Sequence, residues 1–142
     1  MEPLTNYFVA RAQQDINKGN TIVGGMFTAV NRRIDDVKLS WLHTSAYSGG
    51  VDLVHHWLDR KFYVSAQGFA SYVQGSAAAI TTTQLGSERY FQRPDNAYSE
   101  LDTTRKSLLG SGGSFVIGKR SGKLVLDVGC GIGFISQLYP NF

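Results

Sequence analysis

The sequence predicts an all-β protein, an antiparallel up-and-down meander of about six long strands that forms part of a transmembrane β-barrel. Three observations favour this fold. Polar and apolar residues alternate over long stretches, tight-turn signals separate those stretches, and aromatic residues mark both ends of the apolar faces. Soluble strands usually run about 5–6 residues, whereas the alternating stretches here are about twice as long.

The clearest alternation lies in YSGGVDLVHHWLDRKFYVSAQGFASY, residues 47–72, which predicts two strands joined by a tight turn at Asp59 and Arg60. Ten steps of about 3.3 Å, tilted by about 40°, rise roughly 25 Å, which is the height of the apolar band on an outer-membrane barrel. Aromatic girdles flank that band in known barrels. The two apolar faces begin and end at Tyr47, Trp57, Phe62 and Tyr72.

The remaining strands follow from weaker alternation and from turn residues. Asn17 to Asn20 predict a tight turn, because asparagine and glycine tolerate positive φ. The segment VKLSWLH predicts either a short strand extension or a helical turn, and SFVIG predicts a short strand. The expected hairpins are residues 4–31, 45–73 and 114–134, and the long connections are residues 32–44 and 74–113.

The connections alternate between short and long, as they do in outer-membrane barrels with tight periplasmic turns and long outer loops. Six strands do not close such a barrel, which needs at least eight, and open edges are not tolerated in lipid. We therefore expect a piece of a larger barrel, with the lipid bilayer and the rest of a parent polypeptide as partners. The N-terminus lacks the features of a signal peptide, so Met1 is not expected to be the natural start.

Composition narrows the function classes. The net charge is +3 and the basic residues are scattered, which argues against a nucleic-acid partner. The single cysteine, Cys130, excludes an internal disulfide and argues against a cysteine-cluster metal site. His55 and His56 point to opposite faces of a strand and cannot bind one ion together. The sequence thus predicts no enzyme, no cofactor, no metal and no catalytic residue.

One motif competes with this interpretation. The segment LVLDVGCGIGF resembles the first motif of class I methyltransferases that use S-adenosylmethionine, and its cofactor-binding residues would be Asp127, Gly129, Gly131 and Gly133. No alternating βαβ pattern precedes the segment, and the residues that follow it leave no room for a full helix. The favoured interpretation is a strand with an apolar face. The start of a methyltransferase and a soluble β-sandwich or β-solenoid binding module stay as alternatives.

Two further features suggest local roles. Asp52 and Gln67 occupy facing positions on the polar side of the predicted hairpin, so we expect a hydrogen-bonded network there, with Arg11 as a candidate partner for Asp52. The segment RYFQRPD, in the longest connection, combines aromatic residues with arginines. It is expected either to pin that connection into a barrel mouth or to serve recognition.

Four segments together resemble one protein family. They are NYFVARAQQDINKGNTIVGGMFTAVNR, LHTSAYSGGVDLVHHWLDRKFYVSAQ, YFQRPD and SLLGSGGSFVIGK, and they span residues 6–119. Their order and spacing are similar to the C-terminal region of the domain-of-unknown-function 5916 family of Gram-negative bacteria. The resemblance implies an outer-membrane β-barrel without an established activity. It implies carbohydrate as a partner only through an N-terminal domain that lies outside these residues.

Overall fold

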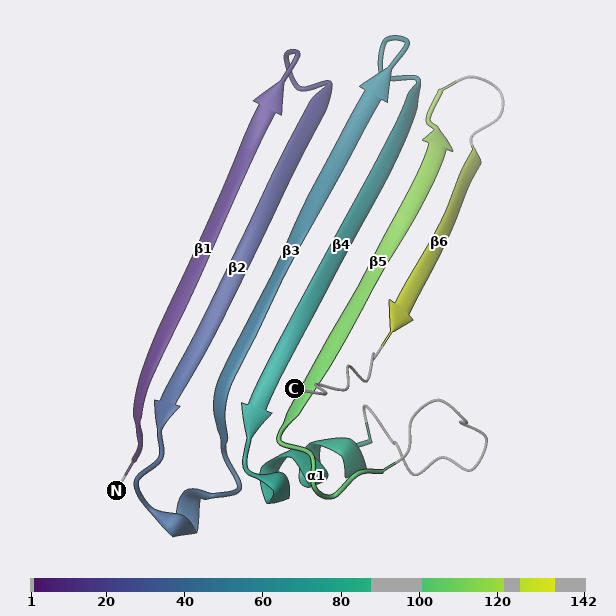
Figure 1. The fold of residues 1–142 in the computed structure, drawn as a ribbon. Coiled ribbons are helices and arrows are strands. Elements are labelled where there is room, and N and C mark those ends of the chain that lie inside the picture. The colour runs from purple at the N-terminus through teal and green to yellow at the C-terminus, as the bar shows by residue number, and fades with distance from the viewer. Residues whose placement is uncertain (1, 88–100, 122–125, 135–142) are drawn as a thin grey trace, which may run out of the picture.

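The computed structural model of the chain describes residues 2–87, 101–121 and 126–134, which form one antiparallel sheet and one short α-helix (Figure 1). Each strand pairs with its neighbours in the chain, in the order β1-β2-β3-β4-β5-β6. The meander of six long strands is therefore confirmed, as an open sheet. The strands are β1 (Leu4–Ile16), β2 (Thr21–Arg33), β3 (His43–Trp57), β4 (Phe62–Gly75), β5 (Ser107–Lys119) and β6 (Leu126–Phe134).

The register confirms the predicted alternation of faces. Tyr47 lies opposite Tyr72, and Trp57 lies opposite Phe62. Both pairs stack, with ring centroids 6.4 Å and 5.8 Å apart. We call the side of the sheet that carries these aromatic pairs the apolar face and the opposite side the polar face. Because the stacked pairs lie near opposite ends of β3 and β4, the apolar residues between them form a band bounded by aromatic rings.

The short turns lie together at one end of the sheet, and the longer connections of residues 34–42 and 76–106 begin and end at the other (Figure 1). Both described short turns use left-handed backbone: φ is positive at each of residues 17–19 and 58–60. Arg60 joins the two turns, because its guanidinium donates to the Lys18 carbonyl at 3.0 Å and to Asn20 Oδ1 at 3.2 Å.

The second turn contains a strained position that can be relieved. Leu58 has φ +50° and is 64% exposed, so its side chain contributes little packing. A left-handed conformation costs a non-glycine residue roughly 1–2 kcal/mol, and glycine avoids this cost. Glycine also gives the unfolded chain more conformational freedom, which offsets about 0.5–1 kcal/mol of the stabilisation. We therefore expect Leu58→Gly to stabilise the protein by about 0.5–1 kcal/mol in urea unfolding. Lys61→Gly, at a position without positive φ, should instead destabilise it.

The long connection is shorter at both ends than the sequence predicts. β4 continues through residues 74–75. β5 begins at Ser107, so residues 107–113 are strand and not part of the predicted connection 74–113. The glycines of this stretch pair within the sheet: Gly113 lies opposite Gly68, and a Cβ on Gly113 would be 2.8 Å from the Gln67 carbonyl oxygen. These glycines therefore permit close strand approach. RYFQRPD, residues 89–95, lies outside the described residues.

Helical structure occurs in both connections. The helix α1 (Ala77–Leu85) was not predicted from the sequence; it begins at Ser76, whose hydroxyl accepts from the Ala79 amide at 3.1 Å, and an alanine run follows. In the other connection the 3₁₀ helix η1 (Val37–Leu39) resolves the two options for VKLSWLH in favour of a helical turn. Its Asp36 cap accepts from the Lys38 amide at 2.9 Å.

Among the described residues, the cluster of buried apolar side chains lies where α1 meets the sheet, and Ala29 and Tyr63 are buried elsewhere in the sheet. Ile80 is fully buried against Leu108 and Val73. The two faces of the sheet elsewhere stay open, and large apolar side chains stand free along β1 to β6. Examples are Phe8, Phe27, Val51, Phe115, Ile117 and Val128. Among the described residues, none forms a protein layer over the apolar face of the sheet.

Candidate functional site

The polar face is the candidate functional surface. One row of side chains crosses all six strands in register near the middle of the sheet. Within that row, Gln67 Nε2 donates to Ser114 Oγ at 2.8 Å. Apart from the aspartate on β3, the row contains only glycine, serine and glutamine. Its members are Gln13, Gly24, Asp52, Gln67, Ser114 and Gly131.

Asp52 is the charged member of this row. It lies opposite Gln67, as the sequence predicted, but the expected partner Arg11 is wrong. The register places Arg11 opposite Met26, and its guanidinium donates to Gln13 Oε1 at 3.3 Å instead. The Asp52 carboxylate lies over Gly24, where a Cβ would be 2.7 Å from both of its oxygens. A side chain at this position would therefore displace the carboxylate.

A second polar cluster lies at the short-turn end of the same face. The Tyr63 hydroxyl donates to Asp127 Oδ1 at 2.8 Å, and the Arg120 guanidinium lies 4.2 Å from the centroid of the Tyr63 ring. Between Tyr63 and Asp127 in the register is Gly118, which leaves room for both side chains. The sequence offered no direct signal for this cluster, because Tyr63 lies 64 residues before its hydrogen-bond partner Asp127.

The residues of the methyltransferase-like motif lie on a strand. Asp127, Gly129, Gly131 and Gly133 all fall within β6, which pairs with β5 from Leu126 to Phe134 without a break. In the cofactor-binding motif the glycines form a loop that opens a helix. Within residues 126–134 there is no such loop, and the Asp127 carboxylate accepts the Tyr63 hydroxyl.

The three histidines lie apart and take different roles. His55 Nδ1 lies 2.8 Å from Thr21 Oγ1, and its ring stacks on Trp57 on the apolar face. His56 lies on the polar face beside the Tyr63 ring. The predicted separation of the two adjacent histidines is thus confirmed. Over the described part of the chain, no group of three or more His, Cys, Asp or Glu residues is placed to hold a metal ion.

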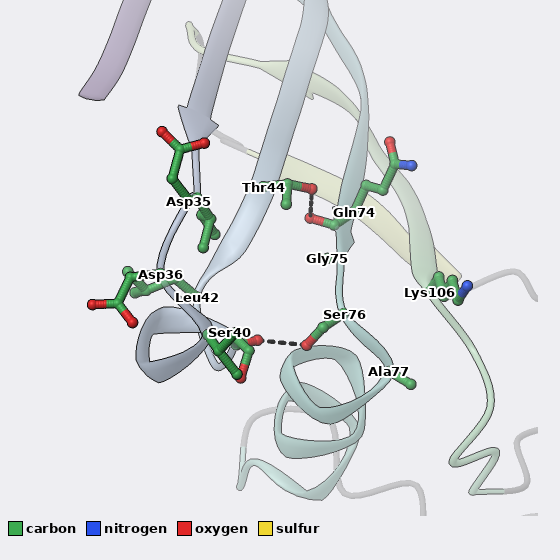
Figure 2. A pocket seen from close by; sticks show the side chains of 12 residues that line it. Asp35, Asp36, Ser40, Leu42, Thr44, Gln74, Gly75, Ser76, Ala77 and Lys106 are labelled. Atoms are coloured by element: carbon green, nitrogen blue, oxygen red, sulfur yellow. Dashed lines mark hydrogen bonds between the residues drawn. The ribbon is translucent and has the colours of Figure 1, made fainter. Parts of the chain in front are cut away.

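An open cavity of about 560 Å³ lies at the end of the sheet that carries the longer connections (Figure 2). Its two carboxylates are already engaged: Asp35 pairs with Arg33 at 3.2 Å, and Asp36 caps η1. The Ser76 hydroxyl donates to the Ser40 carbonyl at 2.5 Å and bridges the two connections across the cavity. The cavity is lined by residues 34–37, 40, 42, 44, 74–77 and 106.

In the segment that precedes β5, the titratable residue Asp102 connects this segment to α1 by hydrogen bonds. Asp102 accepts from the Thr104 hydroxyl at 2.7 Å and from the Thr104 amide at 2.9 Å, and these bonds hold the pKa of Asp102 below its ordinary 3.8. Arg105, 3.6 Å away, lowers the pKa further. The backbone of Asp102 in turn holds Gln84 of α1, donating to Oε1 at 3.0 Å and accepting from Nε2 at 2.8 Å.

The lowered pKa of Asp102 predicts a pH dependence. A carboxylate with a depressed pKa in the folded state stabilises the fold above its unfolded pKa, and that contribution disappears as pH falls through the folded value. At neutral pH, Asp102→Asn should therefore speed hydrogen exchange of the α1 amides relative to the wild type. The difference should vanish well below pH 3.8. An equal difference at both pH values would show that the carboxylate charge is not involved.

The chain was compared with protein-family models, curated proteins and solved structures, and none of the three comparisons gave a match. Within the described residues, none of the helices has the length and apolar character needed to span a membrane.

Proposed function

We propose that this chain is a non-enzymatic segment of an outer-membrane β-barrel from a Gram-negative bacterium, which anchors a larger polypeptide or lets solutes pass. The observation that carries the proposal is the apolar band between the stacked pairs Tyr47–Tyr72 and Trp57–Phe62. The strands β1 to β5 are 13–15 residues long, which is enough for a tilted crossing of the hydrocarbon layer.

The energetics of the apolar face support a lipid contact. Val51 is 67% exposed and Val128 is 56% exposed, although both lie within the band. Each Å² of such surface costs about 25 cal/mol in water, so a row of exposed aliphatic and aromatic side chains across six strands requires a cover. Lipid tails provide that cover along the full height of the band, and the aromatic rings at its ends suit the two membrane interfaces.

The polar face supports the same assignment. Its middle is built from glycine, serine and glutamine, with the Gln67–Ser114 hydrogen bond and few charges. A sheet face that meets bulk water usually carries many lysine and glutamate side chains, yet lysine occurs within the strands only at Lys119, the last residue of β5. We therefore assign the polar face to the barrel interior, where neighbouring side chains form hydrogen bonds with one another.

The sheet edges explain why the proposal includes a larger polypeptide. β1 is a 13-residue edge strand that exposes Tyr7, Phe8 and Val9, and it contains no proline and, besides Arg11 and Asp15, no charged residue. Soluble proteins protect such edges with charges, prolines or bulges, and lipid does not tolerate unpaired backbone groups. We infer that β1 and β6 pair with further strands of the parent protein. The family resemblance favours the same architecture. It implies carbohydrate binding only through a separate N-terminal domain.

Extraction and refolding test the proposal. The parent polypeptide, which supplies the further strands, should need detergent to stay dispersed, should show β-rich circular dichroism in detergent, and should insert into lipid vesicles. A monodisperse protein in buffer without detergent would contradict the proposal and favour a soluble sandwich. Binding of S-adenosylmethionine in calorimetry, abolished by Asp127→Ala, would contradict it in favour of the methyltransferase alternative.

A further inference from the structure

The helix α1 lies at the end of the sheet where the longer connections begin (Figure 1), and its contacts place it on the polar side. This placement follows from the strand register. Val73 and Leu108 are directly paired, and both belong to the alternating set that faces the polar side. Ile80 of α1 is 0% exposed and packs on these two residues. The helix therefore does not extend into the apolar band.

The sheet is shaped to receive the helix. A register shift between His43 and Ser45 on β3 places His43 opposite Gly75, on the polar side. His43 Nε2 then lies 2.7 Å from Thr83 Oγ1 of α1. A Cβ on Gly75 would be 3.3 Å from the Ala79 Cβ, so glycine permits the close approach of the helix to the strand.

Polar contacts brace α1 from two other segments. Ser76 donates to the Ser40 carbonyl in the connection that holds η1. Gln84, which is 0% exposed, makes its paired hydrogen bonds with the backbone of Asp102 just before β5. A buried polar side chain with both of its groups satisfied fixes one position of a helix. The helix is thus held by the sheet, by the first connection and by the segment leading into β5.

We propose that α1 is a built-in constriction at the mouth of the barrel, which limits passage to ions and small solutes. This inference rests on the proposed function, in which the polar face lines the lumen. A helix with its side chains is about 10–12 Å across, and nine residues extend about 14 Å. The interior of an eight-stranded barrel is just wide enough for side chains to fill it, and barrels with more strands leave a channel, so a helix fixed at the mouth narrows that channel.

Single-channel conductance of the parent polypeptide in planar lipid bilayers tests the inference. Ile80→Asp places a charge in the contact with Val73 and Leu108 and should release α1, raising the conductance about twofold or more. Thr82→Asp is the matched control, because it adds the same charge at an exposed position of the same helix and should leave the conductance near that of the wild type. Replacing residues 77–85 with a glycine-serine linker should reproduce the effect of Ile80→Asp.

Insertion is measured separately in the same samples, by quenching of a fluorophore on the apolar face with brominated lipid. Equal conductance of the wild type, Ile80→Asp and the linker variant, all inserted, would overturn the constriction and leave the proposed barrel intact. Absence of lipid quenching in the wild type would overturn both.

Discussion

Val51→Arg is expected to lower the free energy of unfolding in lipid vesicles by about 2–4 kcal/mol, the cost of an arginine at the bilayer midplane on the lipid face of a barrel. Val51 lies midway between the two aromatic rows, is 67% exposed and sits between two glycines, Gly25 and Gly68, on the adjacent strands. No neighbouring side chain in its row therefore shields the introduced charge from hydrocarbon. Urea unfolding of the vesicle-inserted protein measures the change.

Gln67→Arg is the matched control, since it introduces the same side chain one residue from Gly68 at almost the same depth. It points to the polar face and lies opposite Asp52, whose carboxylate can pair with it. The loss of the Gln67–Ser114 hydrogen bond is offset by this pairing, so the net change should stay within about 1 kcal/mol. A larger cost for Gln67→Arg than for Val51→Arg would reverse the assignment of the two faces.

Gly118→Ala is expected to destabilise the protein by about 1–3 kcal/mol, although alanine ordinarily improves on glycine within a strand. A Cβ at this position would overlap Asp127 Oδ1 and would lie 2.7 Å from Tyr63 Cζ. To make room, the tyrosine and the aspartate must separate, and their 2.8 Å hydrogen bond is lost. The change is measured by the same urea unfolding.

Gly68→Ala provides the comparison, because a Cβ on Gly68 would meet no atom within 4 Å. This substitution should be neutral or stabilise by about 0.5 kcal/mol, because it removes unfolded-state freedom without a clash. Equal effects of the two substitutions would mean that the space beside Gly118 is not the reason for its glycine.

The alternation of polar and apolar residues made most of the sheet predictable, and the prediction failed where this alternation is weak. From Tyr47 to Tyr72 the period of two fixes which residues share a face, and a tight turn leaves only one register. β5 carries Leu108 and Leu109 followed by glycines and serines, so alternation fades although the strand continues to Lys119. The pairing of that stretch is determined by β4, which the local sequence does not reveal.

The site was less predictable than the fold. Asp52 and Gln67 were placed opposite each other because both lie on one hairpin, where sequence distance sets the register. The prediction that Arg11 pairs with Asp52 was wrong because it depends on the register of two strand pairs, β1 with β2 and β2 with β3. In the sheet Arg11 lies opposite Met26, whereas Asp52 lies opposite Gly24. The Tyr63–Asp127 bond joins strands on either side of β5, so only the assembled sheet reveals it.

The proposed function depends most on which side chains meet lipid. Single cysteines placed in turn at Ser65, Ala66, Gln67 and Gly68 of β4, with Cys130→Ser as background, can carry a fluorophore that brominated lipid tails quench on contact. In lipid vesicles, the account predicts strong quenching at Ala66 and Gly68 and little at Ser65 and Gln67. A buried core in a soluble sandwich would protect all four sites from lipid. Quenching at none of them, or stronger quenching at Ser65 and Gln67, would contradict the account.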